Sequence, residues 1–137
     1  MVTIDEYIGK RLRQLYVKQN VEFTSLENFV IADEIVFDLG NNFIRIVPII
    51  DTDELAVEYL GESDLIDTRQ LKPILPGFVG KALSAVWSCV NEKGYSDMLI
   101  LSFENLHPSI LVLSEGSSLK VFQANQVKIV KDSSIAA

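Results

Sequence analysis

Two stretches of the chain carry the same succession of residues, and this repetition limits the folds that the chain can adopt. Gly9-Lys10-Arg11-Leu12, followed by Asn20, aligns with Gly80-Lys81-Ala82-Leu83, followed by Asn91. Further on, three apolar segments align in the same order, namely Asp33–Phe37 with Asp97–Leu101, Ile44–Val47 with Ile110–Leu113, and Glu54–Val57 with Ser118–Val121. Strand sequences resemble one another in composition, so the repeat of residues 9–59 in residues 80–122 is a hypothesis.

The opening of the first unit fits two structures. Apolar residues recur at helical spacing after a capping box at Thr3–Glu6, which predicts a helix to about Val17. Gly9 indicates instead a short helical turn that ends there, followed by a strand from Lys10 to Lys18.

The opening of the second unit has the same ambiguity. Helical spacing and strand alternation both fit Val79–Val90, and in a strand four residues share one face: Leu83, Ala85, Trp87 and Cys89. The sequence by itself leaves Lys10–Val17 and Val79–Val90 undecided between strand and helix. If the repeat is real, both segments have one structure, and we expect strands in both.

The remaining apolar segments favour a mainly β fold at the margin of α+β. Each is rich in β-branched residues and is bounded by turn residues, as in Gly40-Asn41-Asn42 and Asn91–Gly94. We predict tandem antiparallel four-stranded meanders that form a two-sheet sandwich or a barrel, with a short N-terminal helix.

The expected domain organisation is simple. The 137 residues fit a single domain, 1–137, with a connector at 60–79 and a frayed tail at 132–137. Within the connector, Asp64–Leu71 is expected to form a helical turn or two before Pro73 and Pro76. Val127–Val130 is expected to form a short edge strand.

The charge and cysteine content exclude several functional classes. The net charge of −7 argues against nucleic-acid binding, because such proteins gather Lys and Arg to neutralise phosphates. A single cysteine, Cys89, permits no intramolecular disulfide and fits a reducing compartment. No signal peptide and no membrane-length apolar run is seen, so we expect a cytoplasmic protein that contacts no membrane.

The second unit resembles a known kind of family. Gly80-Lys81, Trp87, Asn91, Gly94-Tyr95-x-Asp97 and Ser117-Ser118 are similar to a pattern in small bacterial proteins of an uncharacterised domain family. The resemblance covers about half the chain and implies a bacterial, cytoplasmic, β-rich domain. Some families of this kind act as immunity proteins beside toxin genes, so the resemblance also implies an inhibitor role.

Two groups of polar residues are candidate sites. Asp51, Asp53 and Glu54 form the densest carboxylate group, which suits a divalent cation or a basic partner; the alternative is an acidic hairpin tip. Asn91, Tyr95 and Asp97 follow the predicted turn of the second unit and suit a small polar site at the end of a sheet. The favoured alternative there is ordinary turn chemistry.

No catalytic arrangement is recognisable. His107 is the single histidine, and it precedes Pro108 in a predicted loop, while Cys89 is expected to be buried and inert. We expect no cofactor and favour a non-enzymatic, acidic protein-interaction module, with an immunity-type inhibitor as its specific form. The alternative is a small-ligand or divalent-cation binding protein. Edge strands after Pro48 or at Val127–Val130 are expected to allow homo-oligomers.

Overall fold

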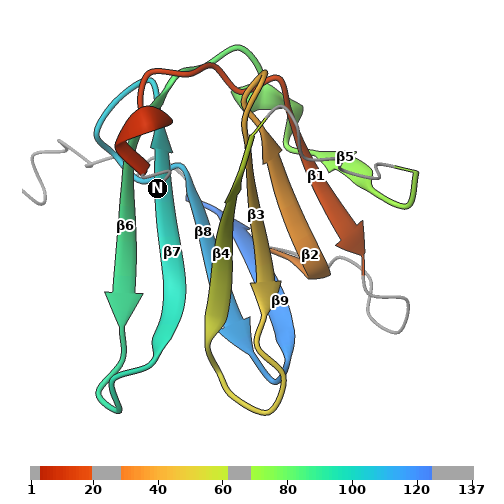
Figure 1. Cartoon of the computed structure of the whole chain (residues 1–137), viewed down its shortest axis with the longest axis vertical. Helices are drawn as coiled ribbons and strands as arrows, with labels where there is room; N and C mark the ends of the chain where they lie inside the picture. The colour runs from red at the N-terminus through yellow and green to blue at the C-terminus, as the bar shows by residue number, and fades with distance from the viewer. Residues whose placement is uncertain (1–3, 20–28, 62–68, 125–137) are drawn as a thin grey trace, which may run out of the picture.

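The computed structural model describes residues 4–19, 29–61 and 69–124 (Figure 1). Its strands are β1 (Gln14–Gln19), β2 (Phe29–Asp38), β3 (Phe43–Pro48), β4 (Leu55–Leu60), β5 (Lys72–Ile74), β6 (Leu83–Val90), β7 (Ser96–Phe103), β8 (Ile110–Glu115) and β9 (Ser118–Gln123). Two short 3₁₀ helices are present, η1 (Ile4–Glu6) and η2 (Pro76–Phe78). Among the described residues, no helix is both long and apolar enough to cross a membrane.

The strands form one antiparallel sheet that curls into a half-barrel (Figure 1). The order is β4-β3-β2-β9-β8-β7-β6, with β1 on β2 and β5 on β1. The long strand β2 is the branch point, because Ile35–Asp38 pair with β3 and Phe29–Ala32 pair with β9. The curl encloses the apolar core, in which Phe37 and Phe103 stack at 6.3 Å.

The two halves of the chain pair internally in the same manner. β1 to β4 pair consecutively, and so do β6 to β9. The registers coincide with the sequence alignment: Ile35 opposes Ile46 in the first half, and the aligned residues Leu99 and Val112 oppose each other in the second. We call two residues equivalent when the alignment pairs them, directly or when it is continued along the same strands in the same register.

The halves meet where their opening segments run antiparallel. Arg11 and Ala82 form an isolated bridge there, and four backbone hydrogen bonds surround it. These bonds form two pairs, and in each pair the same kind of bond is made once from either half. In the first pair, Gly9 N donates to Leu83 O at 2.8 Å and Gly80 N donates to Leu12 O at 2.7 Å. In the second, Leu12 N donates to Lys81 O and Leu83 N donates to Lys10 O, each at 2.9 Å. Gly9 and Gly80 both have positive φ, +92° and +88°, which glycine adopts without steric cost.

The N-terminal segment also links the two open sides of the half-barrel. Tyr7 follows η1 and is fully buried, with its hydroxyl donating to the Leu60 carbonyl of β4 at 3.1 Å. Its ring lies 5.3 Å from that of Tyr59, centroid to centroid. Because Gly9 bonds to β6, this segment connects β4 to β6.

Strands in both opening segments are confirmed, with later starts than the sequence predicted. β1 begins at Gln14 and β6 at Leu83, because the preceding residues form the junction between the halves. A register shift between Leu83 and Ala85 corrects another expectation. Leu83 lies in the core, whereas Trp87 is 39% exposed, so these residues do not share one face.

Other differences concern the connector and the strand ends. No strand was predicted within the connector, yet β5 lies there and pairs with Leu15–Val17 of β1. Among the described residues Pro48 pairs with β4 alone, since β2 pairs with β3 no further than Ile46. Its missing N–H therefore breaks no hydrogen bond to β2. The expectations for most of 64–71, for 127–130 and for the 132–137 tail lie outside the described residues.

Candidate interaction surface

The outer face of the second half, together with the adjoining part of β2, presents two rows of mostly apolar side chains. Because antiparallel partners lie directly opposite each other, the registers of β6, β7, β8, β9 and β2 define each row across five strands. The first row is Trp87, Ile100, Leu111, Phe122 and Phe29. The second row is Cys89, Met98, Leu113, Lys120 and Ile31.

These side chains point away from the core. Their neighbours along each strand, such as Leu99, Leu101 and Val112, are buried inside the half-barrel. Apart from Ile31, which is 8% exposed, every member of the two rows is partly or well exposed. Cys89 belongs to this face and is partly exposed, which corrects the expectation of a buried thiol.

Aromatic and aliphatic groups dominate this surface. The rings of Phe29 and Phe122 lie 5.1 Å apart across the β2–β9 pair. Lys120 is the single charged member of the rows; its ammonium lies 5.6 Å from the centroid of the Phe29 ring and pairs with Glu115. Its charge is therefore held by groups of the same surface. We call the ten residues of the two rows the apolar face.

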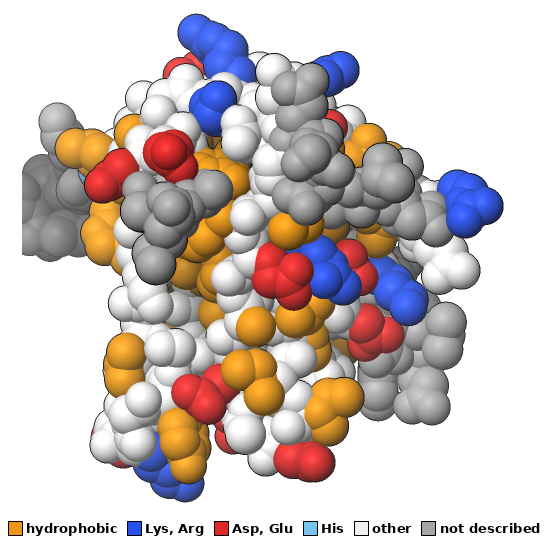
Figure 2. Space-filling view, viewed as in Figure 1, with side chains coloured by type: hydrophobic (Ala, Val, Ile, Leu, Met, Phe, Trp, Pro, Cys, Tyr) orange, Lys and Arg blue, Asp and Glu red, His pale blue; other side chains and the backbone are white. Residues whose placement is uncertain are grey.

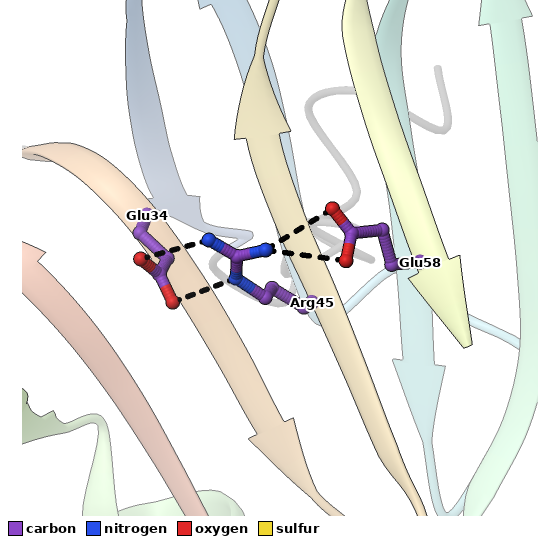
Figure 3. Close-up of polar contacts among 3 residues, drawn as sticks. All are labelled: Glu34, Arg45 and Glu58. Carbon is purple, nitrogen blue, oxygen red and sulfur yellow. Dashed lines mark hydrogen bonds and ion pairs between the residues drawn. The ribbon is translucent and has the colours of Figure 1, made fainter. Parts of the chain in front are cut away.

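The equivalent face of the first half carries charged side chains at three adjacent positions. Arg45 is equivalent to Leu111, and it lies between Glu34 and Glu58, the equivalents of Met98 and Phe122 (Figure 3). Arg45 Nε donates to Glu34 at 2.8 Å, and Nη1 donates to the two oxygens of Glu58 at 3.1 and 3.2 Å.

This ion-pair ladder crosses three strands, β2, β3 and β4. The hydrogen bond to Glu34 is the main reason why the pKa of Arg45 lies above its ordinary value. The two halves thus share strand pairing and register, but one presents a solvated ladder where the other presents apolar side chains.

The acidic group predicted from the sequence lies at the end of the β3–β4 hairpin. Asp51 and Asp53 line a depression of about 310 Å³, together with Tyr95, Thr52, Gly116 and Ser117. Three hairpin ends meet there, and at the lower end of the view in Figure 2 acidic side chains lie among hydrophobic ones. The structure therefore brings Asp51, Asp53 and Tyr95 together, although they belong to different halves.

The other predicted site residues have local roles. Glu54 contributes its backbone, whose carbonyl accepts from Ser114 Oγ at 3.0 Å. The Asn91 amide oxygen accepts from the backbone N–H groups of Lys93 and Tyr95, and its amide nitrogen donates to Asp97 at 3.3 Å. These bonds fix the β6–β7 turn, so Asn91 and Asp97 do not join Asp51 and Asp53.

The lone histidine lies beside another depression on the surface. His107 lines a depression of about 280 Å³ with Lys81 and Ser109, among others, and the Ser109 hydroxyl accepts from Phe103 N at 3.0 Å. Within residues 4–19, 29–61 and 69–124, no three His, Cys, Asp or Glu side chains gather where they could hold a metal ion.

Sequence reasoning missed the apolar face, although a signal was present. Alternation separates inward from outward residues only when the register is known, and the bulge after Leu83 hid the outward direction of Trp87. The signal lay in the repeat alignment itself, which sets Glu34 and Arg45 beside the apolar residues Met98 and Leu111 of the second unit.

Comparison with known proteins gives one result. Residues 1–128 match DUF6334, described as a family of unknown function, and this confirms the resemblance to an uncharacterised domain family. No curated protein and no solved structure matches the chain.

Proposed function

The chain belongs to the DUF6334 family, and we propose that it is a non-enzymatic protein-interaction module that binds its partner through the apolar face. The observation that carries this proposal is the contrast between equivalent positions: Glu34, Arg45 and Glu58 in the first half against Met98, Leu111 and Phe122 in the second. In the first half, charged residues occupy these positions on the solvated outer face. Exposure to solvent therefore does not account for apolar residues at the equivalent positions, whereas binding to a partner does.

The chemistry of the face indicates the kind of partner. Trp and Phe anchors are typical of the energetically important centre of protein interfaces. A chain with a net charge of −7 attracts basic surfaces, so we propose a partner with an apolar patch rimmed by Lys or Arg. Inhibition of a basic bacterial toxin in the cytoplasm is the specific form of this proposal, and a toxin gene beside this one would support it.

The charged residues of the first half suggest a variant that tests the apolar face of the second half. Met98→Glu, Leu111→Arg and Phe122→Glu together transfer the ladder of the first half onto the second, where the register of the three strands is equivalent. The new side chains can pair with one another, so we expect the triple variant to fold. Wild type and triple variant are used in parallel to capture proteins from the cells that carry the gene, and the captured proteins are identified by mass spectrometry.

The proposal predicts a protein that the wild type retains and the triple variant loses by at least about tenfold, which corresponds to about 1.4 kcal/mol. A matched control is Arg45→Leu, which removes charge from the first half and should leave capture intact. Equal capture by wild type and triple variant, or loss of capture in Arg45→Leu alone, would contradict a role for the apolar face.

The acidic hairpin end supports a second proposal, that the chain binds a divalent cation or another small ligand. Asp51 and Asp53 both line the depression that also contains Tyr95. Calcium should then raise the unfolding temperature of the wild type, because a ligand that binds only the folded state stabilises it. The shift should vanish when Asp51 and Asp53 become asparagine and Glu54 becomes glutamine. No shift with calcium, magnesium or manganese would rule out cation binding; loss of partner capture in this variant would instead assign the acidic end to the interface.

A further inference from the structure

The outer edge of β6 is the feature that the proposed function leaves unexplained. β6 is the last strand of the sheet order and lies at the left end in Figure 1. At Leu83 its edge bonds to Gly9 and Lys10, but from Ser84 to Val90 it meets no strand other than β7 among the residues that the structure describes.

The equivalent edge in the first half carries a strand. Leu15, Tyr16 and Val17 of β1 pair with β5, and their equivalents in β6 are Val86, Trp87 and Ser88. In the first half, this edge of the fold therefore accepts an antiparallel strand, β5.

The β6 edge also lacks charged or proline residues that would discourage pairing between chains. Its sequence, Leu-Ser-Ala-Val-Trp-Ser-Cys-Val, contains no charged residue and no proline. Register shifts lie between Leu83 and Ala85 and between Cys89 and Val90, so the segment between them, Ala85–Cys89, pairs regularly with β7. Trp87 at its centre is 39% exposed.

We propose that β6 pairs antiparallel with β6 of a second copy of this chain, about a two-fold axis at Trp87. A two-fold axis at the centre of the regular segment places Ala85 opposite Cys89 of the second copy, and Val86 opposite Ser88. Two-fold symmetric pairing of this kind is the commonest arrangement of homodimers.

The uncharged edge allows a second copy of this chain to pair there despite the net charge of each chain. Two chains of net charge −7 repel each other over most of their surfaces, but pairing through Ala85–Cys89 brings no like charges opposite one another. The pairing also continues the first row of the apolar face across the axis, because Trp87, its member on β6, then lies opposite Trp87 of the second copy. The apolar faces of the two copies thus become one surface that is continuous across the axis.

Light scattering after size exclusion tests the dimer with the full chain. We expect a mass twice the 15.3 kDa of one chain. Trp87→Lys and Trp87→Glu each place like charges at the axis, and each should raise the dimer Kd by at least about tenfold. An equimolar mixture of the two should restore the dimer, since opposite charges then meet; this rescue excludes simple misfolding. A wild type that stays at 15.3 kDa across accessible concentrations would overturn the proposal.

Disulfide trapping tests the register. Cys89 is the only cysteine, so the Ala85→Cys substitution sets its new thiol opposite Cys89 of the second copy, once on each side of the axis. Directly opposed strand residues have a Cα separation within the range that disulfides span. Mild oxidation should therefore give a covalent dimer on a non-reducing gel.

The matched control for trapping is Ala56→Cys on the edge strand β4, which should not cross-link in this way. Equal cross-linking of both variants would contradict the proposed axis. The ladder-transfer variant keeps Ala85–Cys89, so it should remain dimeric even if it loses the partner. Dimer mass and partner capture are therefore separate measurements, so either proposal can be contradicted without the other.

Discussion

Arg11 and Ala82 oppose each other across the bridge at which the two halves of the chain meet. They are equivalent residues, so the contact resembles the axis of a two-fold dimer contained in one chain. The exchanged hydrogen bonds around the bridge and the coinciding strand registers support our proposal that residues 9–59 and 80–122 arose by duplication. We further propose that residues 1–137 form one domain, since the opening segment of each half completes the pairing of the other.

Substitution of either glycine at the junction between the halves should lower the free energy of unfolding by a similar amount. Gly9 and Gly80 have φ of +92° and +88°, and an added Cβ would meet no atom within 4 Å at either position. The cost of Gly9→Ala and of Gly80→Ala is therefore that of the strained backbone, about 1–2 kcal/mol each. Urea unfolding monitored by circular dichroism measures both. Gly77→Ala is the control, because its site is equally open without a positive φ, and it should be neutral or slightly stabilising.

Tyr7 should be the most sensitive residue of the N-terminal segment. Tyr7→Phe removes the hydroxyl that donates to the Leu60 carbonyl, at an expected cost of about 1 kcal/mol. Tyr7→Ala also removes a fully buried ring and should cost about 3–5 kcal/mol. The midpoint of urea unfolding gives both values. Tyr95 is 42% exposed, so Tyr95→Phe should change the midpoint little; a Tyr7→Ala variant as stable as wild type would refute a closing role for this segment.

The ion-pair ladder should contribute little to stability. The side chains of Arg45 and Glu58 are 32% and 40% exposed, so water screens their attraction. Arg45→Leu should cost less than about 1 kcal/mol in urea unfolding at low salt, and the difference from wild type should shrink near 1 M salt. A loss of several kcal/mol that is independent of salt would show instead that Arg45 acts through packing.

Alkaline pH should weaken the fold through Tyr59. Burial, and then the neighbouring Tyr7, raises the pKa of Tyr59 above its ordinary value of 10.0. The folded state therefore holds the Tyr59 proton more tightly than the unfolded state. The stability that this adds is fully present below pH 10.0 and is lost as the pH rises through the folded-state pKa.

Replacement of Tyr59 by Phe tests this pH dependence. We expect Tyr59→Phe to flatten the fall of the urea midpoint above about pH 10, relative to its own value at about pH 8. An unchanged alkaline fall in Tyr59→Phe would assign the effect to other groups.

The sequence predicted the fold well where residue patterns are local. Alternation and turn residues identified the β3–β4 hairpin and the strands β7, β8 and β9, and the positive φ of Gly94 agrees with its expected place in the β6–β7 turn. They left β6 undecided between strand and helix. β5 escaped prediction because its three residues form a strand only by pairing with β1. Among the predicted site residues, Asp51 and Tyr95 line a common depression. Asn91 does not, because its side chain accepts a hydrogen bond from the backbone of its own turn.

The sequence by itself determined that the chain is mainly β, because side-chain period and turn chemistry act over a few residues. Tertiary structure decided which face of each strand is buried. One bulge after Leu83 reverses the direction of Trp87, and pairing across five strands turns separate apolar residues into one face. These properties depend on register between distant segments, which no local pattern contains.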